Sequence, residues 1–62
     1  MAIVKVKDLK KDDLIKSYEI FKDEKWHFVL NVGPGIHDSD VFLALEDYGS
    51  GQFNKNREVE RK

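Results

Sequence analysis

The chain contains no cysteine, one proline and one methionine. The lack of cysteine excludes disulfides, thiolate zinc sites and thiol nucleophiles, and it favours a reducing, cytoplasmic setting because small secreted domains usually rely on disulfides. Long hydrophobic runs are also missing. The longest covers residues 41–45, whereas a membrane helix needs about 20 apolar residues. The sequence therefore predicts a cytoplasmic protein with no membrane segment.

The chain is also short, with 62 residues and a mass of 7.3 kDa. A domain of this size buries roughly 60% of its unfolded surface and builds one small core. Folds that enclose a substrate, such as TIM barrels and dinucleotide-binding domains, need considerably more chain. We therefore expect a single domain over residues 1–62 that is not an enzyme.

Neither sign of charge is in excess, because 11 basic residues stand against 12 acidic ones and the net charge is -1. One tryptophan, four phenylalanines and two tyrosines are available for a core. This combination disfavours a disordered chain. Residues 26–49 include four acidic residues but no lysine or arginine, and we interpret this segment as a solvated acidic rim.

Hydrophobic alternation predicts strands along most of the chain. The clearest pattern is at residues 26–32, where Trp26, Phe28 and Leu30 alternate with other residues. Residues 12–21 fit a strand or a helix, since Leu14, Tyr18 and Phe21 also follow a helical stripe and Asp12 could cap it. We expect an all-β fold with five strands, at residues 2–7, 13–21, 26–32, 40–47 and 52–60.

The alternative is a small α+β fold with a helix near residues 10–22, and a second helix near residues 39–48 is compatible with the pattern. Residues 33–35, Gly-Pro-Gly, predict a turn. In the all-β interpretation, the last segment closes the sheet without adding to the core. The expected core is Val4, Val6, Leu14, Ile20, Phe28, Leu30, Val41, Leu43 and Leu45.

Several short motifs follow one another in an order typical of a known family. They are a charged turn after Leu9 that leads to Leu14 and Ile15, a second charged turn at residues 22–25, Trp26 followed by Val29, and Gly51-Gln52-Phe53 ahead of Val59. Over roughly residues 4–62 this order resembles the SH3-like small barrels. The resemblance implies a five-stranded SH3-like barrel.

The resemblance does not extend to Pro-rich peptide binding. The family's groove-lining proline and tyrosine near the last turn fall on Asn54 and Arg57 here, so Trp26 is the one groove residue that matches. Residues 46–49, Glu-Asp-Tyr-Gly, also resemble the Asp-Tyr-Gly turn of Tudor domains. The paired aromatic residues that would complete a methyl-lysine cage are missing.

No residue pattern indicates catalysis, a metal or a cofactor. His27, His37, Asp38 and Asp40 are ligand types for zinc or manganese, but their spacing is generic and we interpret both histidines as surface residues. Pro34 removes a backbone amide from the only glycine-rich turn, which excludes a phosphate cradle. We expect no catalytic residue, no metal site and no cofactor.

Aromatic residues are the strongest candidates for a binding surface. We expect Trp26, Tyr48 and Phe53 to lie near one another and to form the ligand-binding patch. The predicted function is a small non-enzymatic protein-binding module, of the kind that serves as an adaptor or inhibitor in bacteria and their phages. The alternative is a nucleic-acid-binding small barrel, which the acidic residues among the lysines and arginines make less favourable.

Overall fold

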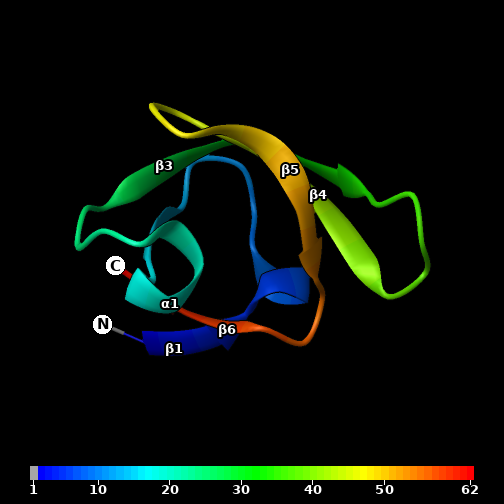
Figure 1. Cartoon of the computed structure of the whole chain (residues 1–62), viewed down its shortest axis with the longest axis horizontal. Coiled ribbons are helices and arrows are strands. Elements are labelled where there is room, and N and C mark those ends of the chain that lie inside the picture. The colour runs from blue at the N-terminus through cyan, green and yellow to red at the C-terminus, as the bar shows by residue number, and fades with distance from the viewer. Residues whose placement is uncertain (1) are drawn as a thin grey trace.

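The computed structural model describes residues 2–62 and consists mainly of short strands (Figure 1). This confirms the all-β class. The elements are β1 (Ala2–Lys5), the 3-10 turn η1 (Val6–Asp8), β2 (Leu14–Lys16), α1 (Tyr18–Phe21), β3 (His27–Pro34), β4 (Asp40–Leu45), β5 (Gly49–Asn54) and β6 (Glu58–Arg61). Within residues 2–62 no helix is both long and apolar enough to cross a membrane.

All strand pairs are antiparallel, and the six strands form one sheet in the order β1-β6-β2-β3-β4-β5. The sheet is strongly curved, so that β3, β4 and β5 arch over one side of the molecule while β1 and β6 form the other (Figure 1). Within the described chain, the edge strands β1 and β5 do not pair with each other. The core lies between the two sides of this open, curved sheet.

The expected strand at residues 13–21 is instead a three-residue strand followed by a single helical turn. Ser17 ends the strand because its side-chain oxygen accepts a hydrogen bond from the backbone N–H of Ile20, at 3.2 Å. Lys22 ends the helix in the left-handed conformation, with φ of 62°, and its N–H donates to the carbonyl of Tyr18. The helix of the α+β alternative is therefore present only as α1, and Ser17, not Asp12, caps it.

The expected strand at residues 52–60 is two strands separated by a turn at residues 55–57. The Asn54 side chain accepts a hydrogen bond from the N–H of Asn56, and the Asn54 carbonyl accepts one from Arg57. This turn lets the chain leave β4 and join β1 and β2 at the opposite end of the sheet, which accounts for six strands where five were expected.

The predicted turn at Gly-Pro-Gly begins later than expected, because β3 continues through Pro34, which pairs with Val41. The turn itself starts at Gly35. A Cβ atom there would lie 2.6 Å from the carbonyl oxygen of Asp40, so a side chain at position 35 would collide with the backbone of the returning strand.

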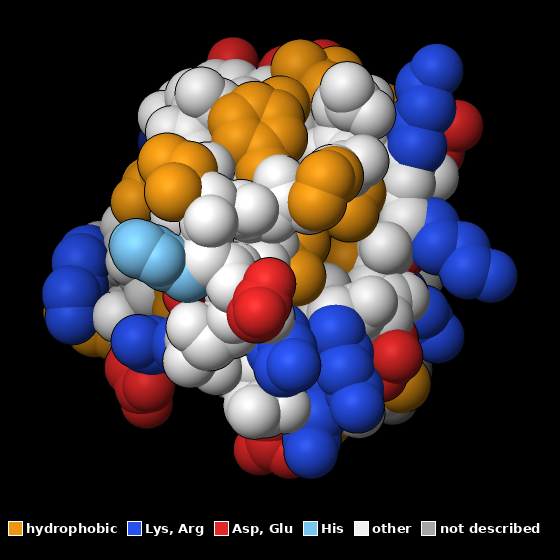
Figure 2. Space-filling view, turned by 90° about the vertical axis from the view of Figure 1, so that its right-hand side faces the viewer, with side chains coloured by type: hydrophobic (Ala, Val, Ile, Leu, Met, Phe, Trp, Pro, Cys, Tyr) orange, Lys and Arg blue, Asp and Glu red, His pale blue; other side chains and the backbone are white. Residues whose placement is uncertain are grey.

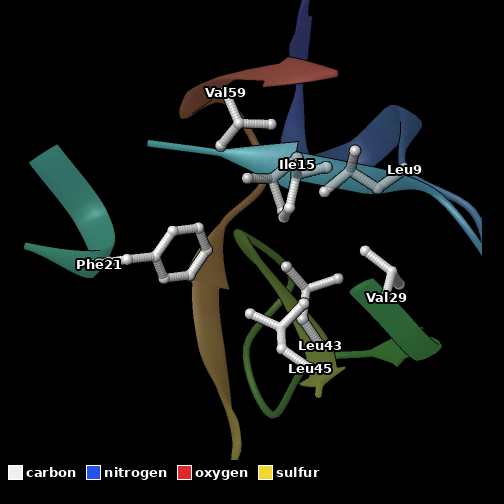
Figure 3. Packing of buried hydrophobic residues seen from close by; sticks show 8 residues of the cluster. Leu9, Ile15, Phe21, Val29, Leu43, Leu45 and Val59 are labelled. Carbon is white, nitrogen blue, oxygen red and sulfur yellow. The ribbon is translucent and has the colours of Figure 1, made fainter. Parts of the chain in front are cut away.

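Eight buried hydrophobic side chains make up the core, and they come from both sides of the curved sheet. Figure 3 shows side chains from β6, β2 and the end of η1 pointing toward those of β3 and β4, while Phe21 of α1 enters from the side. The expectation that the last segment adds nothing to the core is wrong, because Val59 of β6 is buried. The eight are Val6, Leu9, Ile15, Phe21, Val29, Leu43, Leu45 and Val59.

The predicted core is correct for Val6, Leu43 and Leu45, and Val4, Ile20 and Val41 pack against it while half-buried. The predicted core is wrong for β2 and β3, where the buried face of the strand is the one opposite to the predicted face.

Ile15 and Val29 point inward, whereas Leu14 and Phe28 pair with each other on the outer face and are half-buried. Leu30, which is 44% exposed, is the extra residue of a β-bulge between the Val29 and Asn31 pairs. A bulge shifts the alternation by one position, so Val32 faces the core again.

Candidate functional site

The outer surface carries a groove, with a volume of about 580 Å³, between the β2–α1 connection and β6. Residues 16–19 line one side, residues 56–60 line the other, and Ile3 of β1 completes it. We refer to this feature as the α1/β6 groove. Its lining comes from three parts of the chain that the sheet order brings together.

Strand alternation places the groove residues outside the core. Ile3 is paired with Glu60, and Glu60 is paired in turn with Lys16 of β2. Their neighbours along the strands, including Val59 and Ile15, point inward. A row of side chains from β1, β6 and β2 therefore crosses the outer face and forms the floor of the groove.

Two large hydrophobic side chains in this groove are mostly exposed to solvent. Ile3 is 62% exposed and Tyr18 is 64% exposed. Within residues 2–62 the ring of Tyr18 is not paired with any other aromatic ring. Burying such side chains against a partner removes apolar area from water at little cost in rotamer entropy for the tyrosine. The groove can therefore accept apolar side chains from another molecule.

The charges around the groove are nearly balanced. A nitrogen of the Arg57 guanidinium lies 2.8 Å from a carboxylate oxygen of Glu19, which joins the two sides of the groove at one end. The side chains are 41% (Arg57) and 81% (Glu19) exposed, so we expect this ion pair to position them and to add little stability. Lys16 faces Glu60 across β2 and β6. The groove is thus a mainly polar site in which Ile3 and Tyr18 present exposed hydrophobic side chains.

A second group of side chains, the aromatic cluster, consists of Phe21, His27, Tyr48 and Phe53. The ring of Phe21 lies at its centre, with centroid distances of 4.5 Å to His27, 4.9 Å to Tyr48 and 6.1 Å to Phe53. Phe21 and His27 are buried, while Tyr48 is 44% exposed. The cluster connects α1 to the start of β3 and to β5. It packs the side of the core that the open sheet leaves uncovered.

His27 also has a polar partner, contrary to the expectation that it lies on the surface. Its Nε2 lies 3.0 Å from Oδ1 of Asp23 and 3.2 Å from Oδ2. A carboxylate only accepts hydrogen bonds, so Nε2 is the donor. The pKa of Asp23 is lowered from 3.8, mainly because the Lys25 backbone N–H donates to its carboxylate and secondly because His27 does. These contacts hold the charged turn at residues 22–25 against β3.

The three residues expected to form the ligand-binding patch are divided between two places. Tyr48 and Phe53 both belong to the aromatic cluster, with ring centroids 6.4 Å apart. Trp26 makes no ring pair with either of them in the described part of the chain. The ammonium groups of Lys16 and Lys62 lie 4.9 Å and 5.6 Å from its ring centroid. The ligand-binding role of these three residues stays a prediction.

The groove residues Ile3 and Tyr18 were not among the sites predicted from the sequence. A signal was present for Ile3, because the strand pattern that puts Val4 and Val6 on one face leaves Ile3 with Lys5 on the other. No comparable signal marks Tyr18, since its position depends on the helical turn that replaces the expected strand.

The β3–β4 loop forms another exposed surface. Ile36 in this loop is 82% exposed. Figure 2 views the molecule from this side and shows hydrophobic side chains gathered over the upper part of this face, with lysine and arginine over the lower part and along the edges. His37 lies in the same loop, and residues 2–62 contain no group of three His, Asp or Glu side chains placed to hold a metal ion.

Comparisons with protein-family models, with curated proteins and with solved structures find no match for this chain.

Proposed function

We propose that the protein is a small protein-binding module, and that the α1/β6 groove receives apolar side chains from an extended segment of a partner protein. One observation carries this proposal: Ile3 and Tyr18, both more than half exposed, line the same groove. Single exposed hydrophobic residues are common on proteins, but two that share a concave site are a typical feature of binding surfaces.

The size of the molecule limits the kind of contact. A standard interface buries about 800 Å² on each partner, which would be about a fifth of the 4198 Å² surface of this chain. The groove offers room for a few side chains, and two of its charged residues, Arg57 and Glu19, form an ion pair with each other. We therefore infer recognition of a short segment, with Tyr18 and Ile3 as the anchors and the polar rim fixing orientation.

The proposal includes a resemblance to SH3-like barrels, which rests on the order of the sequence motifs. It does not include recognition of Pro-rich peptides. The lack of cysteine supports a cytoplasmic location as a further part of it.

The nucleic-acid alternative receives less support. Proteins that bind single strands stack bases on exposed aromatic rings beside a basic groove. Here the ammonium groups of Lys16 and Lys62 already lie over the ring of Trp26, and the α1/β6 groove contains Glu58 and Glu60.

Selection from a random peptide display library on the immobilised protein tests the proposal. Synthetic peptides from the selection are then titrated against three variants: Tyr18→Ala, Ile3→Ser and the matched control Ile36→Ser. We expect Tyr18→Ala and Ile3→Ser each to weaken binding about tenfold or more, because each removes an anchor.

Ile36→Ser also removes an exposed isoleucine, but from outside the groove, so its affinity should equal that of the original protein. Selected peptides that bind Tyr18→Ala and Ile3→Ser as tightly as the original protein, or a selection that enriches no peptide, would contradict the proposed groove. Circular dichroism on each variant verifies that the fold is retained.

A further inference from the structure

The two edges of the sheet differ in chemistry. Within residues 2–62, β1 and β5 each pair with only one neighbouring strand. β1 contains Lys5 and is followed by Lys7, and charged edge residues are a common means of preventing edge-to-edge pairing. β5 contains no charged residue and no proline in its six positions, Gly49–Asn54. These six positions therefore lack the charges and the proline that usually protect an edge strand. Directly after the strand, the backbone N–H of Lys7 in η1 donates to the carbonyl of Lys55.

The charges next to β5 are arranged with opposite signs at its two ends. Glu46 and Asp47 precede the strand, and Lys55 follows it. All three side chains are exposed. If two β5 strands pair in antiparallel orientation, the acidic end of each copy lies beside the basic end of the other. The strand is thus complementary to itself in charge as well as in direction.

We infer that this protein forms a symmetric dimer in which β5 pairs with β5 of a second copy and extends the two sheets into one. The inference concerns a different surface from the α1/β6 groove and does not depend on the proposed function. Backbone hydrogen bonds along the two edges hold the dimer together, as in other cases of strand addition.

The register of the pairing follows from the faces of the strand. Residues opposite each other in an antiparallel pair must point to the same face of the sheet. A two-fold axis at Gly51 satisfies this rule and places Ser50 opposite Gln52 of the second copy. Asp47 lies in the β4–β5 turn and Lys55 in the turn after β5. The same axis therefore brings the acidic turn of each copy beside the end of β5 that carries Lys55 in the other copy, and by symmetry this contact forms twice.

The other edge does not support self-pairing. Lys5 is the charged residue of β1, and Lys7 lies beyond the strand in η1. An antiparallel pair of β1 strands gives Lys5 no acidic partner on the facing strand, and a charged edge residue of this kind discourages such pairing. The dimer is therefore specific to β5 and closes after two copies, which leaves the β1 edges exposed at its ends.

Charge reversal across the interface tests this arrangement. Asp47→Lys and Lys55→Glu each replace two attractive pairs in the dimer with two repulsive ones. We expect the original protein to dimerise at concentrations between about 10 µM and 1 mM, and each variant to dimerise about tenfold more weakly. An equimolar mixture of the two variants should recover dimerisation as a heterodimer, because both pairs between positions 47 and 55 then join opposite charges again. Sedimentation equilibrium at low ionic strength measures dimerisation of the original protein, of each variant and of the equimolar mixture.

The chain offers matched controls for both variants. Asp12 is exposed and has a positive φ of 77°, close to the 67° of Asp47, so Asp12→Lys reproduces the backbone demand of Asp47→Lys away from β5. Lys22 shows that lysine adopts such a conformation in this fold. Lys11→Glu is the control for Lys55→Glu. Both controls should dimerise like the original protein.

Three results would overturn the inference. One is an original protein that stays monomeric up to about 1 mM. Another is dimerisation that neither Asp47→Lys nor Lys55→Glu weakens relative to the controls. The third is a mixture of the two variants that remains as monomeric as either one alone. Should Asp47→Lys fail to fold, Lys55→Glu and its control still decide between dimer and monomer.

Discussion

The short helix α1 presents two aromatic rings to two different environments. Tyr18 at its start lies in the α1/β6 groove, is 64% exposed and has no aromatic partner within residues 2–62. Phe21 at its end is buried at the centre of the aromatic cluster. The difference separates a ring that stabilises the fold from a ring that is free to contact another molecule.

Tyr48 also shows that ring contacts distinguish a ring of the aromatic cluster from an unpaired ring. It is 44% exposed, yet its ring packs edge-on against Phe21 and lies 5.7 Å from the ring of His27. Exposure alone would place Tyr48 and Tyr18 in one class. Their ring contacts place Tyr48 with the core and leave Tyr18 as the candidate anchor.

The largest expected effect is at the centre of the cluster. Phe21→Ala removes a buried ring that contacts three other rings, and we expect a loss of about 3–5 kcal/mol in the free energy of unfolding. A domain this small has little more stability than that. Urea denaturation followed by tryptophan fluorescence measures the loss. A variant nearly as stable as the original protein would place Phe21 outside the core.

A pair of leucines tests the register of the strands. Leu43→Ala in β4 removes a buried side chain and should cost about 2–5 kcal/mol. Leu30→Ala should cost less than about 1 kcal/mol, because Leu30 is the exposed residue of the β3 bulge. The same denaturation measurement compares them. Equal losses of unfolding free energy in the two variants would indicate that Leu30 points into the core, as the simple alternation predicts.

The two tyrosines provide an intermediate contrast. Tyr48→Ala should lower the free energy of unfolding by about 1–2 kcal/mol, because its ring contacts to Phe21 and His27 are lost. Tyr18→Ala should change it by less than about 0.5 kcal/mol, as expected for an exposed side chain without such contacts. Thermal unfolding of both variants under one buffer condition measures the difference. If Tyr18→Ala proves the more destabilising change, the assignment of Tyr18 to a free surface is wrong.

The smallest effect is a pH dependence at the edge of the cluster. The pKa of Asp23 is lowered from 3.8 in the folded protein, so its ionised form contributes stability at neutral pH. This contribution is present above the unfolded pKa and is lost as the pH falls through the lowered, folded value.

Asp23→Asn should therefore reduce the loss of stability between about pH 5 and about pH 2. Denaturation midpoints across this range provide the measurement. The control Asp38→Asn removes a carboxylate from the exposed β3–β4 loop, away from His27. Identical pH profiles for the two variants would contradict a specific contribution from Asp23.

The sequence predicted the fold class because the alternation over residues 2–7 and the short apolar run at residues 41–45 both indicate strands, and both segments contribute to the core. Val6, Leu43 and Leu45 lie in the core as expected. The buried face of β3 could not be predicted, because the large apolar side chains Trp26, Phe28 and Leu30 lie opposite the buried Val29 and the bulge at Leu30 changes the alternation midway. The bulge depends on pairing with β4, which is a tertiary property.

The α1/β6 groove could not be predicted from the sequence for a similar reason. Tyr18 and Arg57 are far apart in the chain, and they meet because β6 inserts between β1 and β2. The turn at residues 55–57 makes this insertion possible, yet the hydrophobic pattern of residues 52–60 was compatible with one continuous strand. Aromatic composition pointed to a binding surface in general, while the strand order determines which rings pack inside.

Chemical-shift mapping of the isotopically labelled protein with a selected peptide tests the central claim most directly. If the α1/β6 groove is the binding surface, the amide shifts that change most on titration belong to Ile3, residues 16–19 and residues 56–60. Changes concentrated at Trp26, Tyr48 and Phe53, with the groove residues unaffected, would contradict the account and favour the aromatic patch that the sequence alone predicts.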